Sequence, residues 1–451
     1  MKKFLLFAII SILSASVSYA QMDAEQLADI KSQIKAELKQ ELKSEQEKSS
    51  SLVKLKPYGF VRNDFCYDTR ECVTAMGETF NIIPKDQLLN LDGSEDLNDV
   101  DRFTFVAFVS RFGVDLTGPK IGKAESSAKL EADFCGYGEN NTLFRIRQAY
   151  VALDWDRTTL IFGQTWHPMV NQVMPAVYGL ATGSPFASFN RSPQVKVLVD
   201  AGKGWNFTAA ALYQFPNLSV GPDGTSYNYS RWSRIPELYA SWKHVGKHFT
   251  YGLGVDFLSL MPRKKSIAER DVTLSDGTVK TQKVEVRAND RVSGLSSEFF
   301  ADYVNGKFNL KGKLMYAENT AHLTMISGFG ATSYDPQTGS YEYAPVRSAT
   351  SWITATYGKQ LKPGLMLGYM KNLGAKRDFI SVDDFWMRGA KNVDYIYRIS
   401  PSLGYTVKNL LLSLELDYTV VGYGDLSLNG ASKALRDIGN VRTCLMVKYS
   451  F

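Results

Sequence analysis

The sequence lacks any long hydrophobic run beyond its first twenty residues, and this absence excludes the helical way of crossing a membrane. No later segment approaches 18 uninterrupted apolar residues, so no transmembrane helix is expected. Cysteine is also scarce: four cysteines in 451 residues are too few for a disulfide scaffold of this size. The sequence leaves open whether Cys66 and Cys72 are bridged.

Histidine and net charge are both low, which argues against two classes of function. With only four histidines, the nucleophile–base pairs of hydrolases are scarce, and no motif links His167, His244 or His248 to a serine and an acid. The formal net charge of +6 falls to +4 without Lys2 and Lys3, too weak a surplus to indicate nucleic-acid binding. We therefore expect no enzyme activity, no cofactor, no metal centre and no nucleic-acid partner.

The first twenty residues, MKKFLLFAIISILSASVSYA, have the layout of a secretory signal peptide. Two lysines precede an apolar run from Phe4 to about Val17, and the small residue Ala20 ends the segment. We predict residues 1–20 as the signal peptide and Gln21 as the start of the exported protein. The alternative is an uncleaved anchor helix.

From residue 55 onward, the chain repeats one unit, in which a segment of alternating polarity is followed by a turn. One such segment places Trp205, Phe207 and Ala209 on one face and Asn206 and Thr208 on the other. A period of two indicates β-strands with an apolar face and a mixed face. Long and short connections alternate between the segments, and the pattern predicts sixteen strands, eight longer loops and seven tight turns.

An even number of strands with all tight turns at one end is typical of outer-membrane β-barrels. Lipid cannot satisfy an open sheet edge, so a sheet that spans a membrane must close on itself. We predict an all-β fold: a transmembrane antiparallel β-barrel of about 16 strands over residues 51–451, in the outer membrane of a Gram-negative bacterium. A soluble secreted β-protein is the alternative.

The segment ahead of the barrel, residues 21–50, is rich in strong helix formers and contains no glycine or proline. Its apolar positions lie three or four residues apart: Leu27, Ile30, Ile34, Leu38 and Leu42. So narrow a stripe suits a coiled-coil seam, and we predict a periplasmic helix that associates with its own copies. A solvated, partly frayed helix is the alternative.

The chain ends on the strand-like alternation LMVKYSF, in which Leu445, Val447, Tyr449 and Phe451 share one face. The terminal strand has to pair with the first strand to close the barrel, so no tail is expected beyond it. A terminal phenylalanine preceded by alternating apolar residues resembles the signature read by the barrel-assembly machinery. The resemblance implies that Phe451 is an assembly signal.

Two stretches, RIRQAYVALDWDRTTLIFGQTWHP (145–168) and RWSRIPELYASW (231–242), resemble segments of the DcaP-like trimeric outer-membrane porins. Chain length and the lysine-rich signal also suit a porin of a Bacteroidetes-type bacterium. The resemblance implies a homotrimer in the lipid bilayer, in contact with lipopolysaccharide, that is a passive diffusion channel for small hydrophilic, preferentially anionic solutes. The alternatives are a barrel enzyme (a hydrolase) and a surface receptor or adhesin barrel.

The third long loop, WHPMVNQVMPAVYGLATGSPFASFN, contains no Asp, Glu, Lys or Arg. Solvated loops of this length usually carry charge, so we expect burial inside the lumen, with a subunit contact as the alternative. A barrel of sixteen strands leaves an aqueous channel unless a loop folds inward. We therefore predict a constriction loop that includes His167, Tyr178 and Phe186.

Basic residues outnumber acidic ones on the predicted inner face, and rings of Arg or Lys favour anion passage. In the fourth strand, an inward Arg145 and Arg147 would also put Val151 and Leu153 inside unless a bulge intervenes. The best constriction candidates, well inside their strands, are Arg62, Arg111, Lys196 and Arg442. The full predicted pore-lining set is Arg62, Arg111, Lys129, Arg145, Arg147, Lys196, Arg398 and Arg442.

The first long loop contains an acidic stretch, LDGSEDLNDVD (91–101). Oxygen ligands at this density can hold Ca²⁺, but the stretch lacks the ordered spacing of an EF-hand. We favour a solvated acidic rim over a calcium site.

Overall fold

The computed structural model describes residues 35–37, 53–75, 80–136 and 143–451. The predicted signal peptide and almost all of the predicted coiled-coil segment lie outside these ranges; Lys35–Glu37 is helical. In the described residues, no helix has the length and apolar composition needed to span a membrane. Residues 55–116 and 120–451 form one compact unit.

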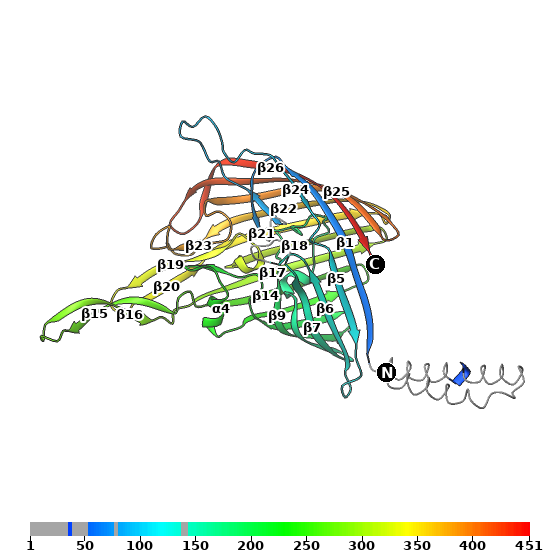
Figure 1. Ribbon diagram of the computed structural model, residues 1–451, viewed down its shortest axis with the longest axis horizontal. Helices are drawn as coiled ribbons and strands as arrows, with labels where there is room; N and C mark the ends of the chain where they lie inside the picture. Colours follow the sequence, from blue (N-terminus) through cyan, green and yellow to red (C-terminus); the bar gives the residue numbers. More distant parts are fainter. Residues whose placement is uncertain (1–34, 38–52, 76–79, 137–142) are drawn as a thin grey trace, which may run out of the picture. The chain divides into compact units, whose positions relative to one another are not determined.

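One antiparallel sheet of seventeen strands closes on itself (Figure 1). Two consecutive strands, β4 and β5, both pair with β1 and are the halves of one interrupted strand, so the barrel wall has sixteen strands, as predicted. The wall strands are β1 (Lys54–Asp68), β4 (Arg102–Val106), β5 (Arg111–Thr117), β6 (Glu125–Asp133), β7 (Arg145–Trp155), β8 (Thr158–Trp166), β9 (Arg191–Gly202), β10 (Trp205–Leu212), β13 (Glu237–Val245), β14 (Phe249–Leu260), β17 (Val292–Asn305), β18 (Phe308–Glu318), β21 (Arg347–Tyr357), β22 (Leu361–Gly374), β24 (Val393–Val407), β25 (Leu410–Leu426) and β26 (Ser432–Ser450).

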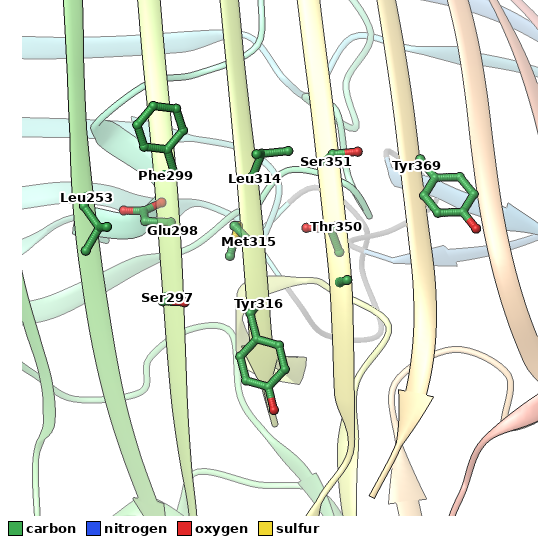
Figure 2. A pocket seen from close by; sticks show the side chains of 11 residues that line it. Leu253, Ser297, Glu298, Phe299, Leu314, Met315, Tyr316, Thr350, Ser351 and Tyr369 are labelled. Atoms are coloured by element: carbon green, nitrogen blue, oxygen red, sulfur yellow. The ribbon is translucent and has the colours of Figure 1, made fainter.

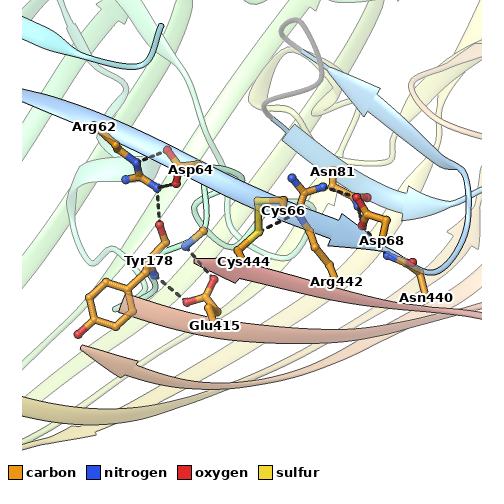
Figure 3. Close-up of a disulfide and its surroundings, with 11 residues drawn as sticks. Arg62, Asp64, Cys66, Asp68, Asn81, Tyr178, Glu415, Asn440, Arg442 and Cys444 are labelled. Atoms are coloured by element: carbon orange, nitrogen blue, oxygen red, sulfur yellow. Dashed lines mark hydrogen bonds and ion pairs between the residues drawn. A yellow bond between two sulfur atoms is a disulfide. The ribbon is translucent and has the colours of Figure 1, made fainter. Parts of the chain in front are cut away.

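The ring closes where the last strand, β26, pairs antiparallel with β1. The pairing runs to the last residue, because Phe451 N donates to Gly59 O at 3.0 Å and Gly59 N donates to Phe451 O at 3.1 Å. A disulfide between Cys66 and Cys444 crosses the same seam (Figure 3). Cys72 is a free, buried thiol, so the possible Cys66–Cys72 bridge does not form.

The wall has an apolar outer face and a polar inner face, as the alternation predicts. Figure 2 shows Phe299 and Leu314 on the side opposite to Glu298 and Met315. Phe299 is 43% exposed, whereas its neighbour Glu298 is 1% exposed. An exposed belt of large apolar side chains around a closed sheet matches the hydrocarbon layer of a membrane.

The seven turns predicted to be tight lie at one end of the barrel, since consecutive strands are antiparallel and long and short connections alternate. The long loops at the other end carry secondary structure of their own, and Figure 1 shows the hairpin β15–β16 projecting beyond the wall. One loop-end connection, residues 427–431, is short, because β25 and β26 extend far past their neighbours. The loop elements are β2 (Cys72–Ala75), β3 (Phe80–Pro84), α3 (Pro168–Asn171), β11 (Val220–Gly221), β12 (Gly224–Thr225), α4 (Asn228–Ser233), β15 (Lys265–Thr273), β16 (Val279–Arg287), η1 (Ala321–Leu323), β19 (Gly328–Asp335), β20 (Ser340–Pro345) and β23 (Phe385–Met387).

The hydrophobic core lies inside the barrel, where several loops pack against one another and against the wall. Ile82 from the first loop, Phe186 from the third and Ile326 from the loop between β18 and β21 belong to one buried cluster. A wall of sixteen strands is too wide to be filled by its own side chains. The inward loops therefore decide how much of the lumen stays open.

Candidate functional site

The third long loop lies inside the barrel. It starts with the short helix α3, whose N-cap is His167, and the loop then contacts opposite parts of the wall. Gln172 Nε2 donates to Ser241 Oγ on β13 at 3.0 Å, and Ala176 N donates to Thr354 Oγ1 on β21 at 3.3 Å. These bonds draw the uncharged loop across the lumen.

Tyr178 lies where the loop meets the closing seam (Figure 3). Glu415 on β25 accepts the backbone N–H groups of Tyr178 and Gly179, both at 2.7 Å. Arg62 on β1 donates to Tyr178 O at 2.7 Å and is also bound to both oxygens of Asp64. A carboxylate that accepts two adjacent backbone N–H groups holds the loop in place. The bond from Arg62 to Tyr178 O helps to hold the same part of the loop.

Phe186 and Arg398 hold the second half of the loop. The buried guanidinium of Arg398 donates to Ser184 O at 2.9 Å, to Ile82 O in the first loop at 3.1 Å, and to Thr419 Oγ1 at 2.7 Å. It also lies 5.4 Å from the centre of the Phe186 ring. Arg398 therefore anchors two loops to the wall and does not line an open passage.

A cavity of about 470 Å³ lies between this loop and the seam side of the wall. Its charged lining residues are Arg62, Arg111, Arg145, Arg147, Lys448 and a single acid, Asp133. Its aromatic lining residues are Phe60, Phe80, Trp166 and Phe189. A mostly apolar pocket with a few convergent charged groups is the usual form of a solute-binding site.

Ion pairs behind the cavity neutralise part of its positive charge. Arg145 and Arg147 both bind Asp133, with shortest distances of 2.7 Å each. Glu131 pairs with Arg147 at 2.9 Å and with Arg111 at 3.5 Å. Together with Asp64, three carboxylates face five basic side chains, so a positive surplus remains.

Several donors at the cavity have no partner. Arg111 Nε and Arg145 Nη1 are buried without a hydrogen bond. Lys448 makes no ion pair with any described residue; its ammonium lies 5.4 Å from the Phe60 ring centre. Arg191, fully buried, lies 4.7 Å from the Trp166 ring and 5.1 Å from the Phe189 ring and leaves Nε and Nη1 unbonded. An anion in the cavity would supply acceptors for such donors.

The open question about the fourth strand is answered by a bulge. The pairing of β6 with β7 skips Arg147, which is the extra residue on its strand. Arg145 and Arg147 can therefore both bind Asp133 inside the barrel, while Val151 is 47% exposed on the outside. The bulge reverses the facing of every later residue on the strand.

Four predicted pore-lining residues lie away from the cavity: Arg398, which anchors the loops, and Lys129, Arg442 and Lys196. Lys129 pairs with Asp115 at 2.5 Å. Arg442 donates to Asp68 at 3.0 Å beside the disulfide. Lys196 is buried on the inner face of β9 and makes no ion pair within the described part of the chain.

Of the four best constriction candidates, Arg62 and Arg111 therefore line the cavity, whereas Lys196 and Arg442 do not. The selection missed Lys448 and Arg191. Lys448 alternates with the outward apolar residues of the last strand and was predicted to face inward, but it was not selected as a constriction residue. Arg191 carried no such signal.

The acidic stretch of the first loop does not gather its carboxylates around one point. Asp96 pairs with Arg70 at 2.6 Å, Asp101 accepts the Tyr67 hydroxyl at 2.7 Å, and Asp92 accepts Ser94 groups of its own turn. The one group of potential metal ligands that converges within the described residues is elsewhere: His167, Glu237 and His322. The calcium alternative gains no support.

A closed barrel with an apolar belt and an inward loop over a basic cavity is the architecture of an outer-membrane porin. The model of the DcaP outer membrane protein family matches residues 13–205, so the predicted resemblance to this family is confirmed. No curated protein matches the sequence. The protein is located in the outer membrane, as predicted.

Solved structures agree on the fold. The outer membrane channel DcaP of Acinetobacter baumannii is 20% identical, with a TM-score of 0.62 over 88% of this chain and 97% of that one. The anion-selective porin from Comamonas acidovorans is 11% identical, with a TM-score of 0.54 over 88% and 100%. OmpT of Vibrio cholerae is 12% identical, with a TM-score of 0.50 over 88% and 98%.

Proposed function

We propose that this porin is a passive diffusion channel for small hydrophilic solutes and that it favours anions. The observation that carries the proposal is the cavity beside the third loop, where five basic side chains face three carboxylates. Charge of one sign in a narrow passage with low-dielectric walls concentrates counter-ions there. The third loop adds no carboxylate that would offset this surplus.

The geometry suggests how a solute carboxylate would pass. The free donors of Arg111 and Arg145 and the unpaired ammonium of Lys448 come from three separate wall strands around one cavity. A carboxylate or phosphate group would exchange its water for these donors, while Phe60 and Trp166 offer apolar contact to the rest of the solute. The carboxylates behind the arginines weaken the binding, and a permeation site has to release its solute.

The constriction role of residues 167–190 belongs to the same proposal. Contacts to β13, β21, β25 and β1 hold the loop across the lumen, so solutes would pass beside it. In this proposal Tyr178 and Phe186 position the loop, while the arginines on the facing wall meet the solute. Arg398 supports both inward loops from behind.

Assembly into a homotrimer is also part of the proposal. Association of the barrels would raise the local concentration of the helices predicted over residues 21–50, so that these helices associate at little further cost. We propose two further partners. The barrel-assembly machinery would recognise the terminal strand that ends in Phe451, and lipopolysaccharide would surround the apolar belt.

A hydrolase on this barrel finds little support. His167 and His322 both contact Glu237, and neither is hydrogen-bonded to a serine, threonine or cysteine within the described residues. A nucleophile within reach of the base is the first requirement of such a site.

Planar bilayers with a salt gradient test the proposed function directly. The zero-current potential of the wild-type channel should have the sign of anion selectivity at low salt. A cation-selective wild type would overturn the anion preference, and a protein that forms no conducting channels would overturn the porin function itself.

A further inference from the structure

A second buried polar cluster lies inside the barrel, outside the basic cavity. It joins His167 at the start of the third loop, Glu237 at the start of β13, and His322 in the short helix η1 of another inward loop. Glu237 Oε1 is 3.0 Å from His167 Nε2 and 2.8 Å from His322 Nε2. The three ligand atoms all lie within 4.8 Å of one another, and the three residues are 0–3% exposed.

A second carboxylate faces this group. Asp256 on β14 is 2% exposed, and its Oδ1 is 4.0 Å from His167 Nε2. Asp256 Oδ1 and Glu237 Oε2 are buried oxygens without a hydrogen-bond partner. Buried polar atoms are nearly always satisfied, so two orphaned carboxylate oxygens beside two imidazoles point to a missing partner.

The negative charge of this site also favours a bound cation. The neighbouring Glu298 is neutralised by Lys313 at 2.6 Å. No lysine or arginine pairs with Glu237 or Asp256 within the described residues, so the two histidines are the basic side chains within ion-pair distance of these buried carboxylates. An uncompensated pair of buried charges is costly, and one divalent cation would remove the imbalance.

We propose that His167, His322, Glu237 and Asp256 bind one divalent transition-metal ion of the zinc class. Imidazole nitrogens together with carboxylate oxygens suit Zn²⁺, whereas Ca²⁺ and Mg²⁺ prefer oxygen ligands alone. The ligand atoms of a tetrahedral zinc site lie roughly 3.3 Å apart. Binding of one ion would therefore draw the two imidazoles and Asp256 closer together, since Asp256 Oδ1 is 4.0 Å from His167 Nε2.

Proton positions determine what the ion displaces. His167 Nδ1 accepts Met169 N–H at 3.2 Å, so without a metal the proton of this ring is on Nε2 and points at Glu237. A metal on Nε2 would leave the ring neutral only if the proton moves to Nδ1, and the cap bond of α3 is then lost. One cap hydrogen bond is a small cost beside the free energy of a buried zinc site.

The ion would fasten two loops to the wall. His167 belongs to the third loop and His322 to the loop between β18 and β21, whereas Glu237 and Asp256 are on adjacent wall strands. None of the four lines the basic cavity. The proposed ion is therefore a structural clamp on the loop and does not meet the permeating solute.

The test uses the full-length protein, extracted in detergent, carrying no polyhistidine tag, stripped with a chelator and dialysed against Zn²⁺. Bound zinc is measured by elemental analysis in wild type, His322→Gln and Glu237→Gln. His248→Gln is the matched control, because His248 is exposed at the turn end and bonds only Val304 O. Heat-modifiable migration on gels shows that each variant still forms a barrel.

We expect about one zinc ion per chain in wild type and in the control, and a loss of roughly tenfold or more in the other two variants. Co²⁺ in place of zinc should give the visible absorption of a four-coordinate nitrogen–oxygen site. Wild type that retains no stoichiometric zinc would overturn the proposal, and so would a folded His322→Gln variant that binds as much as the control.

Discussion

Cys66 and Cys444 are directly opposite each other on the first and last strands of the barrel and form a disulfide across the closing seam. They are 378 residues apart in the chain. Every other pair of neighbouring wall strands is connected by a turn or loop, whereas β1 and β26 meet only through pairing. The disulfide therefore gives the seam the covalent link that it otherwise lacks.

Removing this link should weaken the barrel. Cys66→Ser combined with Cys444→Ser should lower the temperature at which the folded band converts to the unfolded band on gels. A disulfide that closes so long a loop restricts the unfolded chain by a free energy on the order of 5 kcal/mol.

Cys72→Ser is the control, since Cys72 is a free thiol in the first loop, and burial raises its pKa to about 12. Equal transition temperatures for the double variant and the control, without reductant, would argue against the bridge.

Replacing the free cations of the cavity should change ion selectivity. Arg111→Glu combined with Lys448→Glu should lower the ratio of anion to cation permeability by roughly threefold or more, because the lining surplus becomes negative. The wild-type bias itself should shrink at high salt, since screening shortens the range of the charges.

Lys129→Glu is the matched control for this measurement. It reverses one basic charge on the same inner wall, half the charge change of the double variant, but Lys129 does not line the cavity. A control that shifts the zero-current potential as much as the double variant would place the selectivity elsewhere.

Loss of Arg398 should release the inward loops. Arg398→Ala removes three hydrogen bonds from a buried guanidinium, a loss on the order of 3 kcal/mol at the point where two loops meet the wall. We expect larger or noisier single-channel currents than in wild type. Lys359→Ala is the control, because Lys359 is an exposed residue at the turn end, and its currents should equal those of wild type. If Arg398→Ala gives the same currents as wild type, the loop is held by its other contacts.

The terminal aromatic residue should matter for assembly. Phe451 is 63% exposed on the outer face, so its ring contributes little to the folded barrel, although its backbone pairs with Gly59. Phe451→Asp should reduce the amount of heat-modifiable protein in the outer-membrane fraction while export continues, and Phe451→Tyr should restore it. Unchanged barrel yield in Phe451→Asp would remove the assembly role.

Deleting residues 22–48 should weaken trimers without abolishing them, because barrel walls would supply most of the contact. Light scattering in mild detergent, at several protein concentrations, measures the change. A full-length protein that is monomeric under these conditions would contradict both the helix association and the trimer.

The sequence by itself determined the strands, their number, their faces and the closure of the barrel. These features follow from a local signal, because polarity that alternates with a period of two is visible within each segment. The alternation of long and short connections then leaves one antiparallel arrangement, and lipid requires that it close. The lack of charge in the third loop, again a local property, also predicted its burial.

Only the tertiary structure decided which side chains meet. The bulge at Arg147, the partner of Cys66, the convergence of Arg111 with Lys448, and the meeting of His167 with His322 all join residues far apart in the chain or depend on a one-residue shift in pairing. Alternation predicts which face of the wall a side chain is on. It does not predict the position of that side chain along the barrel axis or which inward loop packs over it. The position along the axis depends on strand register, and the contact with a loop depends on how the inward loops pack. Register and loop packing are established only when the sheet closes around those loops.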